Sequence, residues 1–166
     1  MNKNTPVSIF WFRRDLRLED NAGLYHALKG GAPVLPLFIF DKAILEQLSD
    51  RKDARVTFIH TAVESLKAQL ENLGSSLLVR FGTPQEVFAQ LTQEYTIQSV
   101  FTNRDYEPYA QKRDADITSL LAAQGATFHT FKDHVIFEKG EVLKDDGTPY
   151  VVFTPYSRKW LAKLDQ

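Results

Sequence analysis

Five short apolar runs alternate with helix-forming stretches, and this alternation limits the fold of the chain more than any other feature. The runs are rich in β-branched and aromatic residues, which predicts buried strands at residues 7–12, 34–40, 76–81, 97–102 and 126–131. Strands that alternate with helices form a parallel sheet with helices on both faces. We therefore predict an α/β fold with a five-stranded, doubly wound, Rossmann-like sheet in the order 3-2-1-4-5.

Capping residues and apolar spacing predict where the helices lie. Asp20 or Asn21 can cap a first helix, and Thr83 followed by Pro84 can open another. Apolar residues at steps of three and four predict a long helix that Gly74 ends. The expected helices span residues 22–29, 56–73, 84–95, 108–123 and 156–163, with a helical turn at 44–48, a polar loop at 49–53 and extended segments at 134–142 and 148–153.

Length and composition indicate a single globular domain over residues 1–166. No apolar run approaches the roughly 18 residues of a membrane span, and the leader MNKNTP is too short and polar for a secretory signal. The chain has no cysteine, which excludes disulfides and thiolate chemistry and favours a cytoplasmic setting. A net charge of −1 indicates that the domain alone binds DNA weakly.

Standard catalytic arrangements are missing from the sequence. It contains no G-x-G-x-x-G, no G-x-x-x-x-G-K-[ST] and no G-x-S-x-G motif. The four histidines lack the spacing of metal ligands, and His129 and His134 fit ordinary surface positions better. We therefore expect no catalytic residue and no metal site.

Charged residues follow three of the predicted strands. Arg13 comes after the first strand, Asp41 after the second and Asp105 after the fourth. The carboxyl ends of parallel strands meet at one edge of a sheet, and ligands of open α/β sheets bind there. The predicted strand order therefore brings these three residues together.

This edge suits a flat heteroaromatic ligand with polar edges. Phe38 offers an apolar contact to a ring, and Asp105 and Glu107 can accept hydrogen bonds from N–H or hydroxyl groups. Arg55, near the start of the long helix, either meets an anionic ligand edge, or is held by a carboxylate, or is simply exposed. The competing interpretation is that Asp105 and Glu107 only balance nearby cations, namely Arg104, Lys112 and Arg113.

Three stretches in the same order resemble the photolyase/cryptochrome family of flavin-dependent blue-light proteins. They are WFRRDLRLEDN at residues 11–21, NRDYEPYAQKRD at 103–114 and PYVVFTPYSRKW at 149–160. The resemblance covers the N-terminal α/β domain and implies a DNA photolyase, which repairs pyrimidine dimers with light. It implies that FAD and damaged DNA bind a C-terminal helical domain that this chain lacks, so we expect no repair by these residues alone.

The resemblance also implies an antenna chromophore that passes excitation to FAD. Matching motif to motif, its binding residues are Phe38, Asp41, Arg55, Asp105 and Glu107. Folate-type members tend to carry Asn-Glu after the Tyr-Glu pair, where this chain has a Tyr-Ala pair at 109–110, so a deazaflavin or other flavin is favoured over reduced folate. For the charged turn at 13–17 the resemblance implies a conformational and interdomain role.

Two alternatives stay open. The first is a cryptochrome, a photoreceptor that signals through partners, because the N-terminal domains of the two groups are so alike. The second is an unrelated nucleotide-binding α/β module, which the fold alone permits. The expected partners are damaged DNA through the full-length protein and the C-terminal helical domain of the same protein, with no membrane.

Overall fold

The computed structural model describes residues 5–50 and 53–165. The leader residues 1–4, and residues 51–52 of the predicted polar loop, lie outside the described residues. The strands are β1 (Val7–Phe12), β2 (Val34–Asp41), β3 (Leu78–Gly82), β4 (Ile97–Asn103) and β5 (Thr127–Phe131). The helices are α1 (Ala22–Lys29), α2 (Lys42–Leu45), α3 (Ala54–Asn72), α4 (Pro84–Glu94), α5 (Pro108–Ala122) and α6 (Phe153–Leu164).

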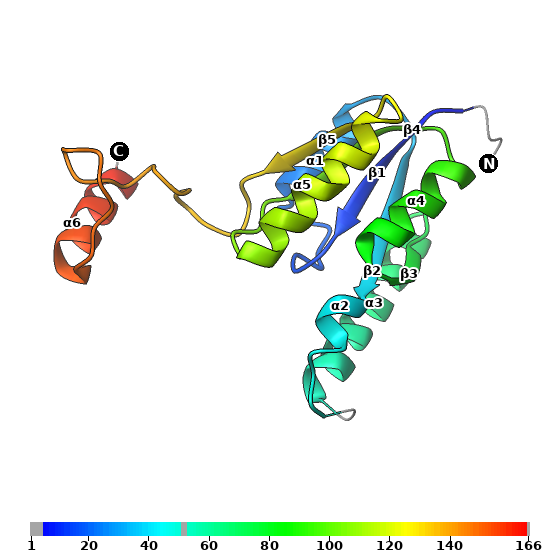
Figure 1. Ribbon diagram of the computed structural model, residues 1–166, viewed down its shortest axis with the longest axis horizontal. Coiled ribbons are helices and arrows are strands. Elements are labelled where there is room, and N and C mark those ends of the chain that lie inside the picture. Colours follow the sequence, from blue (N-terminus) through cyan, green and yellow to red (C-terminus); the bar gives the residue numbers. More distant parts are fainter. Residues whose placement is uncertain (1–4, 51–52, 166) are drawn as a thin grey trace. The chain divides into compact units, whose positions relative to one another are not determined.

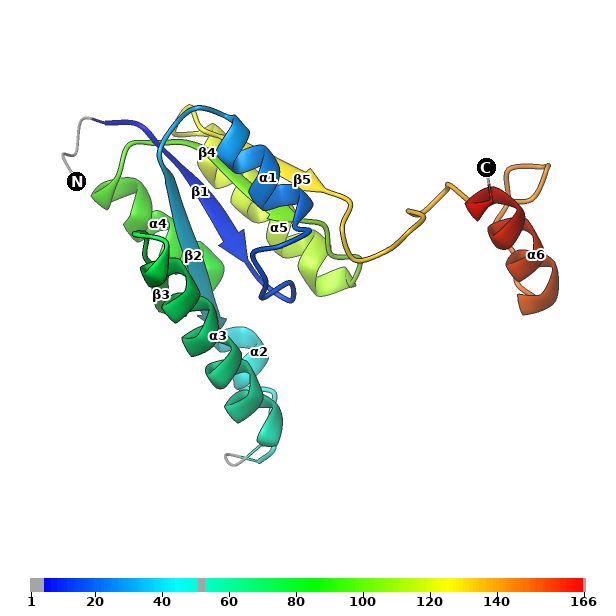
Figure 2. The ribbon, with the colours of Figure 1, turned by 180° about the vertical axis from the view of Figure 1, so that it is seen from behind.

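The five strands form one parallel sheet in the order β3-β2-β1-β4-β5, which confirms the predicted topology. α4 and α5 cover one face of the sheet (Figure 1), and α1 and α3 cover the other (Figure 2). β1 lies at the centre, between β2 and β4. The order of the strands reverses there, which is where doubly wound folds bind ligands.

β1 is buried on both faces because every one of its six side chains is apolar or small. Ile9 and Trp11 pack among residues of α4 and α5, whereas Phe10 and Phe12 pack among residues of α1 and α3. This alternation follows from the two-residue period of a strand. β1 therefore belongs to both halves of the core, and the turn that follows it is held firmly in place.

Helix starts follow the predicted capping signals. Asn21 accepts a hydrogen bond from the Leu24 N–H at 3.1 Å. Thr83 and Glu86 form a reciprocal capping box ahead of α4, with Pro84 at its first position. α3 ends before Gly74, which takes a positive φ of 76°. Helix boundaries lie within two or three residues of the predicted ones, as is usual for sequence patterns.

The chain divides into two compact units, Met1–His134 and Val135–Gln166. In the second unit the extended segments predicted at 134–142 and 148–153 are turns and bends, so that prediction is wrong. Gly147, with a φ of 79°, closes a turn by donating to the Lys144 carbonyl at 3.0 Å. The predicted last helix is present as α6.

Two pairs of aromatic residues pack against each other within the second unit. Trp160 meets Phe137 edge to face with ring centroids 5.4 Å apart, and Tyr150 meets Tyr156 at 6.1 Å. No helix within residues 5–50 and 53–165 combines the length and the apolar character needed to cross a bilayer.

Candidate functional site

A cavity of about 240 Å³ opens at the carboxyl ends of β1 and β2. Its wall comes from the ends of these strands, from α2, from one turn of α3 and from the start of α5 with the loop before it. Four of the five predicted site residues line it, namely Phe38, Asp41, Asp105 and Glu107. The fold thus brings together side chains from positions 38 to 107, as the predicted strand order requires.

The floor of the cavity is rigid and largely apolar. Trp11 and Phe38 are buried in the two halves of the core. The buried guanidinium of Arg113 lies over the Trp11 ring at 5.0 Å and over the Tyr109 ring at 5.7 Å. Its Nη2 lies 3.0 Å from Asp114 Oδ1 but has no hydrogen-bond partner among the described residues. Within the described part of the chain, that N–H group is therefore an unpaired hydrogen-bond donor next to the cavity.

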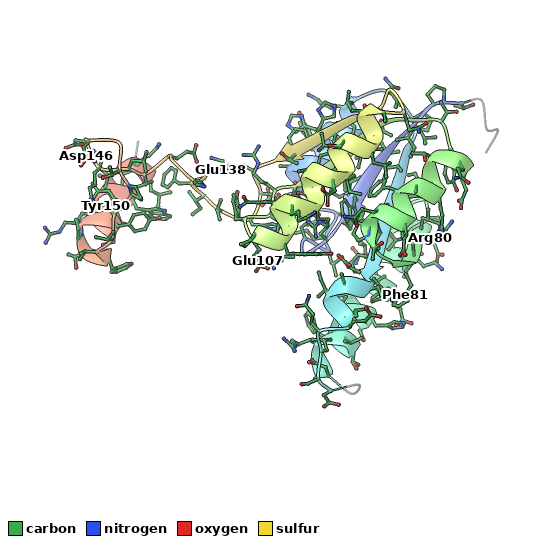
Figure 3. The ribbon with its side chains drawn as sticks, viewed as in Figure 1. Arg80, Phe81, Glu107, Glu138, Asp146 and Tyr150 are labelled. Carbon is green, nitrogen blue, oxygen red and sulfur yellow. The ribbon has the colours of Figure 1, made fainter. Side chains whose placement is uncertain are left out.

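The rim is charged and accessible. Arg14 Nη2 lies 2.6 Å from Glu107 Oε1, and Arg14 Nε lies 3.3 Å from Asp105 Oδ2. Glu107 lies at the start of α5 (Figure 3), and its hydrogen bond with Arg14 raises the pKa of that guanidinium. The side chain of Arg14 is 57% exposed. The two carboxylates therefore do balance a cation, Arg14, which is not among the three cations named from the sequence.

A hydrogen bond joins the two sides of the cavity. Tyr109 Oη donates to Asp41 Oδ2 at 2.6 Å, while Asp41 Oδ1 accepts from the Ala43 N–H at 3.0 Å and caps α2. Burial first, and then the bond to Asp41, raise the pKa of the Tyr109 hydroxyl. The phenol therefore stays protonated and acts as a donor over the whole physiological range.

Arg55 is the one predicted site residue that does not line the cavity. Its side chain is 74% exposed and pairs with Asp53, the capping residue of α3, at 2.5 Å. This ion pair lowers the pKa of Asp53 to about 2. Ile59, one turn along α3, reaches the cavity wall instead. Of the alternatives open for Arg55, the structure shows the one in which a carboxylate holds it.

A second polar cluster lies beside the cavity and fastens the turn after β1 to the end of β4. The buried amide of Asn103 donates to the Asp15 carboxylate and, at 2.8 Å, to Asn21 Oδ1, and it accepts from the Gly23 N–H at 2.8 Å. Asp15 also accepts from the Arg13 N–H at 3.2 Å. We call Asp15, Asn21 and Asn103, with the Gly23 N–H, the turn network.

Arg13 extends this connection to α5. Its side chain is only 6% exposed, donates to the Asn103 carbonyl, and reaches Asp114 Oδ1 at 2.6 Å. Burial, and then the nearby Arg113, lower the pKa of the Arg13 guanidinium. Two buried guanidinium groups therefore share the Asp114 carboxylate, and both lie against Trp11.

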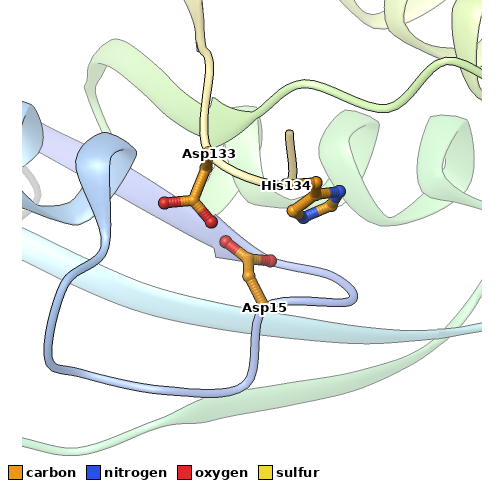
Figure 4. A group of neighbouring side chains, drawn as sticks. All are labelled: Asp15, Asp133 and His134. Atoms are coloured by element: carbon orange, nitrogen blue, oxygen red, sulfur yellow. The ribbon is translucent and has the colours of Figure 1, made fainter. Parts of the chain in front are cut away.

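Asp15, Asp133 and His134 offer ligand atoms that all lie within 4.8 Å of one another (Figure 4). The carboxylates already have partners. Arg17 Nη2 lies 2.9 Å from both oxygens of Asp133, and the Ala22 N–H donates to Asp133 Oδ1 at 3.1 Å. Asp15 is committed to the turn network. Arg17 thus supplies the positive charge beside Asp133, and Asp15 is held by uncharged donors of the turn network.

Comparison with known proteins decides the family. The family model described as DNA photolyase matches residues 8–166. This chain belongs to the DNA photolyase family. It is 35% identical to a deoxyribodipyrimidine photo-lyase from a Synechococcus strain, over 93% of this chain and 32% of that protein.

Solved structures of photolyases share the fold. A class III photolyase from Agrobacterium tumefaciens superimposes with a TM-score of 0.81 and 30% identity, covering 93% of this chain and 31% of that one. An archaeal photolyase from Sulfolobus tokodaii, described with two FAD molecules and a novel light-harvesting cofactor, has a TM-score of 0.76 and 29% identity, covering 92% of this chain and 34% of that one. The chain spans about a third of the length of these relatives.

Within this photolyase-family domain, sequence reasoning missed two residues of the cavity rim, Arg14 and Tyr109. The family resemblance implies only a conformational role for Arg14, although its position two residues beyond a buried strand is a usable signal. The sequence marks Tyr109 only as a departure from the folate-type pattern. Its spacing of one residue beyond Pro108, at the start of a helix, places it at the same rim as Glu107.

Proposed function

We propose that this chain is the N-terminal domain of a deoxyribodipyrimidine photolyase, an enzyme that repairs pyrimidine dimers in DNA with light. The chain matches the family over nearly its whole length but spans about a third of the full relatives. We assign FAD, the damaged DNA and the lyase reaction to the remaining part of the protein. The α/β domain supplies light collection.

We propose that the cavity at the ends of β1 and β2 binds the antenna chromophore. The observation that carries this assignment is the gathering of Phe38, Asp41, Asp105 and Glu107 around one opening. At about 240 Å³ the cavity is smaller than the roughly 300–1,000 Å³ that encloses a whole drug-sized ligand. It therefore suits a ring system whose substituents remain outside.

The residues of the cavity fit a flavin or deazaflavin ring. Trp11 and Phe38 offer apolar contact, and the Arg113 guanidinium over the Trp11 ring supplies positive charge beneath the cavity. Asp105 and Glu107 can accept hydrogen bonds from hydroxyl or N–H groups of the ligand once the Arg14 side chain moves away from them. The Tyr109-Ala110 pair departs from the folate-type pattern, and the Sulfolobus tokodaii relative carries a second FAD, so a flavin-type antenna is favoured.

Titration of the purified domain with a deazaflavin, with riboflavin, with reduced folate and with ATP tests this assignment. We expect a shifted absorption band and saturable binding for the deazaflavin or the flavin, and no comparable binding of ATP, the ligand that a nucleotide-binding module would prefer. Asp105→Asn should weaken binding roughly tenfold, since a hydrogen bond to a charged acceptor is lost. Asp145→Asn, an exposed carboxylate of the second unit, is the matched control. Equal binding by both variants would place the chromophore elsewhere.

The enzymatic half of the proposal has its own test. Residues 1–166 alone should leave thymine dimers in an irradiated oligonucleotide intact under blue light, with or without added FAD. The full-length protein should repair them. Repair by the isolated domain would contradict the assignment of the chemistry to the remaining part of the protein.

A further inference from the structure

The hydrogen bond between Tyr109 and Asp41 crosses the place where a ligand would enter. Asp41 ends β2, and Tyr109 is the second residue of α5, which follows β4. Because β1 lies between β2 and β4, the 2.6 Å bond spans the carboxyl end of β1. A ring that enters this crevice has to lie against that bond or replace it.

Asp41 and Tyr109 differ in how tightly their side chains are held. Asp41 is buried, and its Oδ1 is fixed as the cap of α2, so its Oδ2 points into the cavity wall with Tyr109 as its hydrogen-bond donor among the described residues. Tyr109 is 37% exposed and lies at the first turn of its helix. If its side chain turns outward, the hydroxyl exchanges its bond to Asp41 for bonds to water, and the ring gives up its contact with the Arg113 guanidinium, so the ligand has to replace both interactions.

We propose that Tyr109 is a built-in competitor for the ligand of this cavity. In the closed form its hydroxyl occupies Asp41 Oδ2; in the loaded form a ring N–H of the ligand donates to that oxygen and the Tyr109 side chain turns outward. This inference rests on the proposed chromophore site and adds a selection rule to it. A ring without an N–H donor leaves a buried carboxylate oxygen unpaired, which is costly, so the cavity selects heteroaromatic rings with an imide-type N–H.

Lumiflavin and 3-methyllumiflavin are matched probes. They differ only at the imide nitrogen, which carries hydrogen in the first and a methyl group in the second. All variants are made in a Trp160→Phe background, which leaves Trp11, a residue of the cavity floor, as the single tryptophan. Tyr109→Phe removes the competing hydroxyl and keeps the ring. Tyr25→Phe, an exposed tyrosine of α1 outside the cavity lining, is the control.

We expect Tyr109→Phe to bind lumiflavin roughly tenfold more tightly than the parent, and Tyr25→Phe to bind like the parent. Methylation of the imide nitrogen should remove most of the affinity in both forms. Without ligand, acrylamide should quench Trp11 fluorescence more strongly in Tyr109→Phe, because the closed form is less populated.

The two ways of failing are distinguishable. If Tyr109→Phe binds lumiflavin equally well or more weakly, or if methylation has no effect, the competitor role is overturned while the chromophore site stands. If neither the parent nor Tyr109→Phe binds lumiflavin, the flavin-type assignment of the site fails. The quenching experiment then tests separately whether Tyr109 closes the cavity. Unchanged quenching of Trp11 would show that Tyr109 does not close the cavity.

Discussion

The charged turn after β1 has two sides that behave differently. On one side, the side chains of Arg13 and Asp15 are buried and bond to Asn103 at the end of β4 and to Asp114 in the middle of α5. On the other side, Arg14 reaches the cavity rim, where its side chain is 57% exposed against 6% for Arg13. Neighbouring arginines in one motif therefore have separate roles: Arg13 joins elements of the fold, and Arg14 pairs with the two carboxylates at the cavity rim.

This contrast predicts where substitutions act. A buried polar group that loses its partner costs the full desolvation of whatever is left unpaired, whereas an exposed ion pair contributes about 1 kcal/mol or less. Changes in the turn network should therefore reduce the free energy of unfolding. Changes at the rim should alter ligand affinity and leave stability nearly unchanged.

Asn103→Ala should have the largest effect. The amide of Asn103 serves Asp15, Asn21 and the Gly23 N–H at once, so its removal takes a donor from the buried Asp15 carboxylate and the acceptor from the buried Gly23 N–H. We expect a loss of about 3 kcal/mol in the free energy of unfolding, measured by urea denaturation. Asn72→Ala, at the exposed end of α3, should change it by less than about 0.5 kcal/mol. Similar values for the two variants would show that the network does not hold the turn.

Gly23→Ala should be nearly as severe, although alanine normally favours a helix. A Cβ at Gly23 would lie 2.7 Å from Asn103 Oδ1 and 2.8 Å from Phe10 Cε2, so α1 approaches the sheet at a distance that only glycine permits. We expect a loss of about 2 kcal/mol by overpacking and displacement of Asn103, again from urea denaturation.

Gly30→Ala provides the contrast for that change. Gly30 has an ordinary helical φ of −68°, and its nearest neighbour to a new Cβ is a carbonyl oxygen at 3.3 Å. We expect a change within about 0.5 kcal/mol. A Gly23→Ala variant as stable as Gly30→Ala would rule out the close approach of α1 to β4.

Much of this architecture could be predicted from the sequence because it depends on periodic burial. The runs that form β1, β2 and β4 are apolar on both faces, which only a covered parallel sheet accommodates. The strand order then placed Phe38, Asp41, Asp105 and Glu107 at one edge, where the structure has them. The end of a strand fixes where the backbone of such a residue lies, independently of the conformation of its side chain.

The partners of individual side chains could not be predicted, because they depend on where each side chain points and on which polar groups lie nearest to it. Arg55 pairs with a residue close to it in the sequence, because Asp53 caps the same helix two residues earlier and accepts hydrogen bonds from both its backbone and its side chain. Tyr109 finds Asp41 across 68 positions of sequence, and no local pattern reports such a pairing. The second unit has turns, such as the one that Gly147 closes on the Lys144 carbonyl, in place of the predicted extended segments.

Arg13→Gln and Arg14→Gln test the two sides of the turn with one chemistry. Arg13→Gln removes a buried partner of Asp114, although Arg113 remains, and we expect a loss of about 2 kcal/mol in the free energy of unfolding. Arg14→Gln should cost about 1 kcal/mol or less, because the Arg14 and Glu107 side chains are exposed, although the Asp105 side chain that also loses a partner is only 9% exposed. Urea denaturation of both variants measures the difference, and equal losses would remove the distinction between the two sides.

The ion pair of Asp53 and Arg55 should give the smallest effect, visible as a pH dependence. Hydrogen bonds from the Arg55 side chain and backbone lower the pKa of Asp53 to about 2, from an ordinary value of 3.8. A carboxyl group with a lowered pKa in the folded state stabilises it above the ordinary pKa, and that contribution is lost as the pH falls from about 4 toward 2. Asp53→Asn keeps a side chain that can cap α3 but removes the charge.

We therefore expect the parent to be slightly more stable than Asp53→Asn at pH 6, with the gap closing below about pH 4. Urea denaturation at a series of pH values and low salt measures the gap, since salt screens an exposed pair. Arg55→Gln should abolish the same pH dependence while leaving the carboxylate in place. A gap that persists unchanged to pH 2, or one that survives in Arg55→Gln, would show that Arg55 is not held by Asp53 and is free to reach a ligand.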